Sequence, residues 1–190
     1  PLKPEPLHPL GLNPEDAWGL TFIDRGDCRE KIESVSGHAI YTPPSEQGVI
    51  LYPSNLGGHN WGAPAVDLKR KVMITNTKRL PIHVRMAPQD QCPDKLPFPQ
   101  KDSPYCITME PLVSNLGSPC AEPPWATLDA TDLESGEILW SVPLGTLEKM
   151  VPWPFYHFIE GGIEMGGPMV TAGGLVFIGA TSDAYLRAFD

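Results

Sequence analysis

The feature that most constrains the fold of this chain is an internal repeat. Residues 62–76 align without a gap with the start of residues 166–190, so that Gly62 falls on Gly166. The other matched pairs are Pro64 with Pro168, Val66 with Val170, Val72 with Val176 and Ile74 with Ile178. Residues 128–132 also match 186–190 if the first copy contains a long insertion. Because self-similarity of this kind is the signature of a repeat architecture, we predict two copies of one structural unit.

Each unit is predicted to form short antiparallel strands. The first copy ends with an Ala-x-Asp-x-x-x-Gly-x-x-x-Trp pattern that runs from Ala130 to Trp140. Gly136 suits the turn, Asp132 can accept hydrogen bonds from the turn's backbone amides, and Trp140 offers a wide apolar face. A four-stranded antiparallel unit of this type is the blade of a β-propeller.

The composition agrees with a β-rich fold. The 190 residues include 23 Pro and 18 Gly, and only 19% are charged, which favours short strands and structured loops. We expect an all-β fold with short helices that forms part of a β-propeller.

Three regions are predicted along the chain. Residues 1–56 form a Pro-rich lead-in with short helices and one strand, residues 57–142 form one blade with a Cys- and Pro-rich insertion at 77–123, and residues 143–190 form most of the next blade. Because the second copy stops before the strand that reaches Trp140 in the first, we expect a piece of a larger protein.

Two short helices are predicted in the lead-in. Asn13 and Pro14 are suited to the N-cap and first position of one helix, and residues 28–35 are compatible with a second. Gly19 and Gly26 are expected to limit the two helices.

The charge and hydropathy pattern exclude two classes of partner. The formal net charge is -9, and no stripe of Lys and Arg is present to neutralise nucleic-acid phosphates. No run of residues is long and apolar enough for a membrane helix, and the Pro-rich start lacks a signal-peptide core. The protein is therefore soluble by itself, or its targeting part lies outside this chain.

Cys28, Cys92, Cys106 and Cys120 form no CxxC pair, and no His lies beside them at metal-ligand spacing, so a zinc site is not predicted. They either form disulfides in an oxidising compartment or remain thiols in a cytosolic protein. Cys92 and Cys106 bracket a Pro-rich loop in which a crosslink would supply order, and this favours disulfides.

The chain contains no complete catalytic motif. No Gly-x-Ser-x-Gly, phosphate-binding or dinucleotide-binding sequence is present. The histidines lie far apart in sequence and are interpreted as loop or surface residues: His8, His38, His59, His83 and His157. By itself the chain is not expected to complete an active site.

Several segments together resemble the C-terminal part of membrane-bound quinoprotein dehydrogenases, the pyrroloquinoline quinone (PQQ) enzymes of the glucose and quinate/shikimate type. The segments are Thr-Pro-Pro-Ser-Glu-Gln-Gly at 42–48, residues 61–76, Pro119-Cys120, residues 130–140 and residues 166–189. Only the insertion is poorly matched.

The resemblance implies a fold and an activity for the parent protein. The chain would be a partial eight-bladed β-propeller of the quinoprotein alcohol dehydrogenase type, and the complete propeller would hold PQQ near its axis. A divalent metal (calcium or magnesium) would polarise the quinone, and an aspartate would remove the alcohol proton. A sugar or cyclic polyol (glucose, quinate or shikimate) would be oxidised by hydride transfer, and ubiquinone would receive the electrons. The parent would lie on the periplasmic side of the bacterial inner membrane, held there by an N-terminal part absent from this chain.

The resemblance also assigns roles to individual residues. The family's catalytic aspartate and quinone-contacting lysine match positions before Pro1, so no catalytic residue, metal ligand or retained cofactor is expected in this chain. Asn76 matches an asparagine at the quinone, where its amide could reach a carbonyl oxygen, and Trp61 matches a tryptophan at the start of that blade, near the same pocket. The alternatives are a turn-capping Asn76 and a packing Trp61.

Cys28 and Cys120 match cysteines of this family. The resemblance therefore implies a Cys28–Cys120 bond, with an additional Cys92–Cys106 bond.

Two functional hypotheses follow. The first is a fragment, inactive alone, of a PQQ-dependent dehydrogenase, and the second is a non-catalytic β-propeller module that serves as a scaffold or binding surface. In either case, exposed blade edges are expected to promote self-association, unless the insertion and the Pro-rich start cover them.

Overall fold

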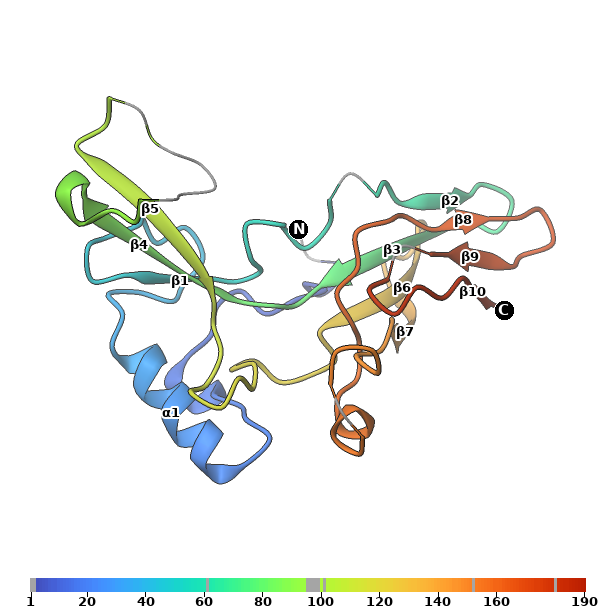
Figure 1. Ribbon diagram of the computed structural model, residues 1–190. Coiled ribbons are helices and arrows are strands. Elements are labelled where there is room, and N and C mark those ends of the chain that lie inside the picture. Colours follow the sequence, from blue (N-terminus) through green and yellow to red (C-terminus); the bar gives the residue numbers. More distant parts are fainter. Residues whose placement is uncertain (1–2, 61, 95–99, 101, 152, 180) are drawn as a thin grey trace. The chain divides into compact units, whose positions relative to one another are not determined.

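The computed structural model describes residues 3–60, 62–94, 100, 102–151, 153–179 and 181–190. It divides into two compact units, each formed by segments that are distant in sequence. Unit 1 contains residues 1–9, 56–79 and 123–190, and unit 2 contains residues 10–55 and 80–122. Figure 1 shows the strands of both units and the helix α1 of unit 2.

Unit 1 contains a four-stranded antiparallel sheet of order β2-β3-β6-β7 (Figure 1). Its strands are β2 (Ala65–Asp67), β3 (Val72–Lys78), β6 (Ala126–Asp132) and β7 (Ile138–Pro143). The sheet has the strand number and antiparallel order of a propeller blade.

Aspartates shape both hairpin turns of this sheet. Between β2 and β3, Asp67 accepts hydrogen bonds from the amides of Lys69 and Arg70, each at 2.9 Å. Between β6 and β7, Asp132 accepts from the amides of Glu134 and Ser135 at 2.8 and 2.7 Å. The role predicted for Asp132 is confirmed.

A second sheet of unit 1 has the order β8-β9-β10. Its strands are β8 (Met169–Val170), β9 (Val176–Ile178) and β10 (Arg187–Phe189), and the loop before it contains the 3₁₀ helix η3 (Phe155–Phe158). The three strands expected in this segment are therefore present.

The two sheets of unit 1 share one apolar core. Its buried members are Ile74, Ala126, Leu128, Ala130, Leu144, Val176 and Ile178. The matched glycines of the repeat lie against each other: a Cβ on Gly62 would come within 2.4 Å of the Gly166 carbonyl carbon. The repeat therefore retains glycine because two backbones pass too closely for any side chain.

Unit 2 combines a helical segment with a three-stranded sheet of order β1-β4-β5. Its elements are η1 (Pro14–Asp16), α1 (Phe22–Glu33), β1 (Val49–Leu51), β4 (Ile82–Pro88), η2 (Gln89–Gln91) and β5 (Tyr105–Pro111). Its core joins the lead-in to the insertion through the buried residues Leu12, Ala17, Cys28, Ile32, Ile50, Tyr52, Leu112, Cys120 and Ala121.

The main helix differs from the one predicted. α1 begins at Phe22 because Thr21 and Asp24 form a capping box, in which the Thr21 hydroxyl accepts the Asp24 amide. The prediction that Gly26 limits a helix is wrong, since Gly26 lies inside α1 with no atom within 4 Å of the position of a Cβ. At that open position glycine only weakens the helix without ending it.

Both disulfides are present, as the resemblance implies. Cys28 in α1 bonds to Cys120, and Cys92 bonds to Cys106 in β5. Within the described ranges, no helix combines the length and apolar character needed to cross a membrane.

The two disulfides are expected to stabilise unit 2 unequally. The bridged cysteines are 92 residues apart in Cys28–Cys120 and 14 apart in Cys92–Cys106. In the chain-entropy model these loops correspond to about 4.5 and about 3 kcal/mol of unfolding free energy. Urea unfolding of the paired alanine variants should show the larger loss for Cys28→Ala/Cys120→Ala, and an equal or reversed order would contradict this assignment.

Candidate cofactor-contacting site

The end of β3 places two polar side chains on the face that packs against the second sheet of unit 1. Side chains alternate between the faces of a strand, so Asn76 and Lys78 share a face with the core residue Ile74. Asn76 pairs with Leu128 and Lys78 with Ala126 on β6. Both polar residues are buried, with exposed fractions of 2% and 5%.

The orientation of the Asn76 carboxamide follows from its neighbours. Its Nδ2 donates to Glu164 Oε2 and, at 2.5 Å, to the Gly166 carbonyl oxygen. Both neighbours accept hydrogen bonds, so a flipped amide would place its oxygen against two acceptors. Because both N–H groups of the amide already donate, any further hydrogen bond would have to be accepted by Oδ1. To donate to a quinone carbonyl, Asn76 would first have to release Glu164 or Gly166.

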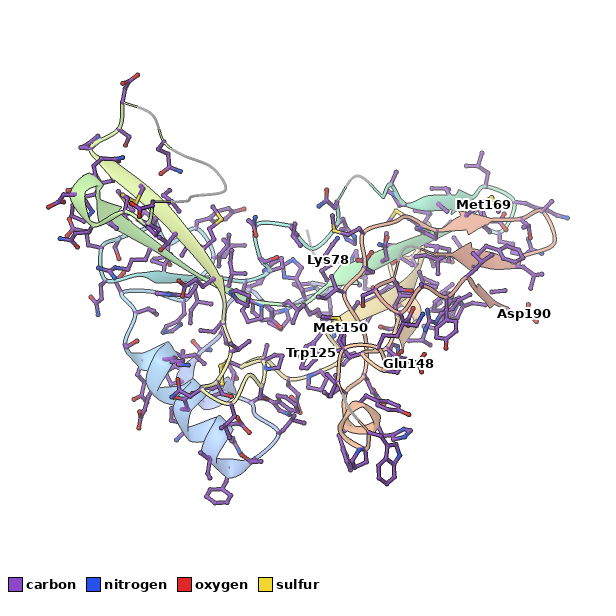
Figure 2. All side chains as sticks on the ribbon, in the orientation of Figure 1. Lys78, Trp125, Glu148, Met150, Met169 and Asp190 are labelled. Atoms are coloured by element: carbon purple, nitrogen blue, oxygen red, sulfur yellow. A yellow bond between two sulfur atoms is a disulfide. The ribbon has the colours of Figure 1, made fainter. Side chains whose placement is uncertain are left out.

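Lys78 and Glu164 form a buried ion pair. Nζ of Lys78 lies 3.4 Å from Oε1 of Glu164, and their side chains are 6% and 0% exposed. Within the described part of the chain, neither of these two atoms has a hydrogen-bond partner. Removing two charges from water costs several kcal/mol per ion, which such a pair recovers only with good geometry and additional hydrogen bonds. Figure 2 labels Lys78 at the end of β3.

The position of Glu164 depends on the loop that follows β9. Glu164 forms an isolated antiparallel bridge with Thr181. The Thr181 hydroxyl donates to Asp183 Oδ1 at 2.5 Å, and Arg187 makes an ion pair with the same carboxylate at 2.5 Å. Burial alone would raise the pKa of Asp183, but the hydrogen bonds from Arg187 and Thr181, with two backbone amides, hold it well below the usual range.

The opposite face of the blade contains another buried carboxylate. Asp129 on β6 is fully buried and accepts hydrogen bonds from Thr77 at 2.8 Å, Thr127 at 2.9 Å and Ser141 at 2.5 Å. Three hydroxyl donors satisfy a carboxylate without a cation. We interpret this network as a structural element that joins β3, β6 and β7.

The residues predicted from the sequence have different outcomes. Asn76 lies in the polar cluster just described, together with Lys78 and Glu164, which the sequence analysis missed. A lysine at a core-facing position of a strand is the sequence signal that could have identified Lys78. No local signal identifies Glu164, because it lies far from Lys78 in the sequence. Trp61 lies outside the described residues.

The donor set fits an anionic organic group better than a metal ion. In the part of the chain that the structure describes, no three His, Cys, Asp or Glu side chains form a group that could hold a metal. A buried ammonium without a hydrogen-bond acceptor is suited to an anionic oxygen, and PQQ carries carboxylate groups. Asn76 and Lys78 are thus the residues here that suit this cofactor.

Sequence comparison assigns the chain to a family. The model for the PQQ-dependent glucose/ethanol/alcohol dehydrogenase β-propeller domain matches residues 1–190. The chain therefore belongs to the PQQ β-propeller family, and its predicted fold class, a partial propeller, is confirmed.

Relatives with assigned activities match nearly the whole chain. It is 36% identical to the quinoprotein glucose dehydrogenase of Escherichia coli K12 over 94% of its residues, which is 24% of that protein. It is 35% identical to the quinate/shikimate dehydrogenase (quinone) of Acinetobacter baylyi over 94% of the chain and 24% of the relative. For the probable quinate dehydrogenase (quinone) of Xanthomonas campestris pv. juglandis the values are 36%, 94% and 25%. The chain thus spans about a quarter of the length of these relatives.

Loss of Glu164 should destabilise unit 1. Glu164→Ala leaves the Lys78 ammonium buried without its counter-charge, which is expected to cost about 3 to 5 kcal/mol of unfolding free energy. Glu134→Ala is the matched control, because Glu134 pairs with Lys71 with 66% of its side chain exposed, and exposed pairs contribute about 1 kcal/mol or less. Equal losses in urea unfolding would contradict the buried pair.

Acidification should remove the stabilisation that Asp183 provides. A carboxylate whose pKa is lowered by folding stabilises the protein above its unfolded pKa, near 3.8 for Asp183. This contribution is lost as pH falls through the lower, folded pKa. The urea midpoint of the wild-type protein should therefore exceed that of Asp183→Asn by a larger margin at pH 6 than at pH 3. Asp90→Asn, at an exposed position, is the control, and its urea midpoint should not approach that of wild type at pH 3. A difference between wild type and Asp183→Asn that is the same at both pH values would contradict the assignment.

Proposed function

We propose that this chain forms part of the propeller of a PQQ-dependent dehydrogenase that oxidises a sugar or cyclic polyol. The observation that carries the proposal is the match of the PQQ β-propeller model to residues 1–190. The similarity to glucose and quinate/shikimate dehydrogenases supports this substrate class. Glucose, quinate and shikimate are the substrates to test first.

The proposal assigns binding and orientation to this chain and the chemistry to other parts of the protein. PQQ, when bound, accepts the two electrons of the alcohol oxidation, and a divalent calcium or magnesium ion assists it. Proton removal belongs to an aspartate outside this chain. The family resemblance assigns contact with the cofactor to Asn76 and also to Trp61, which lies outside the described residues.

Burial of Asn76 supports its assignment. Its side chain is held by Glu164 and Gly166 on the core-facing side of β3. An amide fixed by two acceptors presents its oxygen in a defined direction, which suits orientation of a planar cofactor.

The proposal also includes a cellular setting and partners. The protein acts on the periplasmic side of the bacterial inner membrane and passes electrons to ubiquinone. Both disulfides are consistent with an oxidising compartment. Self-association of the isolated chain through blade edges remains a prediction.

The experiment is reconstitution of the full-length protein that carries this chain. It should bind PQQ in the presence of calcium or magnesium and reduce a dye with glucose, quinate or shikimate. Asn76→Ala should weaken PQQ binding about tenfold, the loss expected for one hydrogen bond in a preformed site. Exposed Asn115→Ala in unit 2 is the control and should bind PQQ as wild type does.

Failure of the full-length protein to bind PQQ, together with no oxidation of any of the three substrates, would contradict the enzyme assignment. That result would instead favour a non-catalytic propeller scaffold.

A further inference from the structure

Lys78 is a buried cation for which the described residues supply no hydrogen-bond acceptor. Its ammonium has three N–H donors, and no hydrogen bond to any of them is found among the described residues. Its one ionic neighbour, Glu164 Oε1, is 3.4 Å away and likewise has no hydrogen-bond donor in the described part of the chain. Buried polar groups are hydrogen-bonded in the great majority of proteins, so this one requires an explanation.

The place of Lys78 in the sheet indicates what could satisfy it. Lys78 lies two residues after Asn76 on the same face of β3, and Glu164 contacts both side chains. One carboxylate thus holds a carboxamide and an ammonium side by side. A group with anionic oxygens could engage the ammonium while its planar body lies near the carboxamide.

We propose that Lys78 is a second cofactor-binding residue, which donates a hydrogen bond to an anionic oxygen of PQQ. This inference rests on the proposed function. Glu164 is a positioning residue: it holds Lys78 and Asn76 in a common arrangement and does not itself contact the anionic cofactor. The pair is neutral as a whole, so it does not repel an anionic cofactor, and the Lys78 ammonium can donate a hydrogen bond to a cofactor oxygen.

The competing explanation is that Lys78 only neutralises Glu164. The two explanations differ in a double variant that removes both charges. Lys78→Met/Glu164→Gln leaves no unpaired buried charge and keeps similar side-chain volumes, so the fold should be retained even if Lys78→Met alone unfolds the protein. If Lys78 only neutralises Glu164, this variant should bind PQQ as wild type does.

The test measures the PQQ dissociation constant of the full-length protein by fluorescence titration, with calcium present. The double variant is expected to unfold near the wild-type urea midpoint but to bind PQQ about 10- to 100-fold more weakly, because one charge-assisted hydrogen bond is lost. Lys71→Met/Glu134→Gln is the matched control, since this pair has side chains 55% and 66% exposed. It should bind PQQ with the wild-type constant.

The inference is overturned if the folded double variant binds PQQ with the wild-type dissociation constant. This outcome leaves the proposed function intact, because wild type still binds the cofactor. If wild type itself binds no PQQ, the proposed function fails and the inference fails with it, so the two failures are distinguishable. Lys78→Arg, which retains the charge, should bind more tightly than the double variant, and the reverse order would contradict a role for the cation.

Discussion

The antiparallel pairing of β3 with β6 is the constraint on which the candidate site depends. The two strands pair over seven consecutive positions, from Val72 with Asp132 to Lys78 with Ala126. A shift of the register by one residue would move every side chain to the opposite face. The pairing therefore decides that Asn76 and Lys78 face the core shared with the second sheet, while Thr77 faces the Asp129 network.

The same pairing explains how a long insertion is accommodated. Residues 80–122 leave the blade between two strands that are already paired, and they build unit 2 together with residues 10–55. The Cys28–Cys120 disulfide and a common apolar core join these two segments. The blade consequently keeps its four strands although the chain between its second and third strands builds much of another compact unit.

The buried polar cluster of unit 1 is poorly explained by a contribution to stability alone. Apolar residues in place of a buried ion pair are often as stable or more stable, so stability alone gives little reason for Lys78 and Glu164. The Asp129 network differs, because its carboxylate accepts three hydroxyl donors. Among the described residues, the unsatisfied buried group on one face is a charged ammonium, that of Lys78, whereas those on the Asp129 face are the neutral hydroxyls of Thr75 and Thr131.

Repetition within the sequence predicted much of the fold. The match of Gly62 with Gly166 corresponds to a close backbone contact. The strands of residues 166–190 lie where the turn residues between them predicted. The start of helix α1 was not predicted, because its capping box outweighs the low helix propensity of Gly26. Glu164 was not predictable, since only tertiary packing brings it to Lys78. The disulfide pairing came from the family resemblance, because four cysteines alone allow three connectivities.

The most direct test of this account is an experimental structure of the full-length protein with PQQ bound. The measurement is the distance from Lys78 Nζ to the nearest cofactor oxygen. The account predicts a direct contact of about 2.7 to 3.2 Å, with Glu164 still beside Asn76. A cofactor bound elsewhere, or a Lys78 ammonium that contacts only Glu164 in the complex, would contradict it.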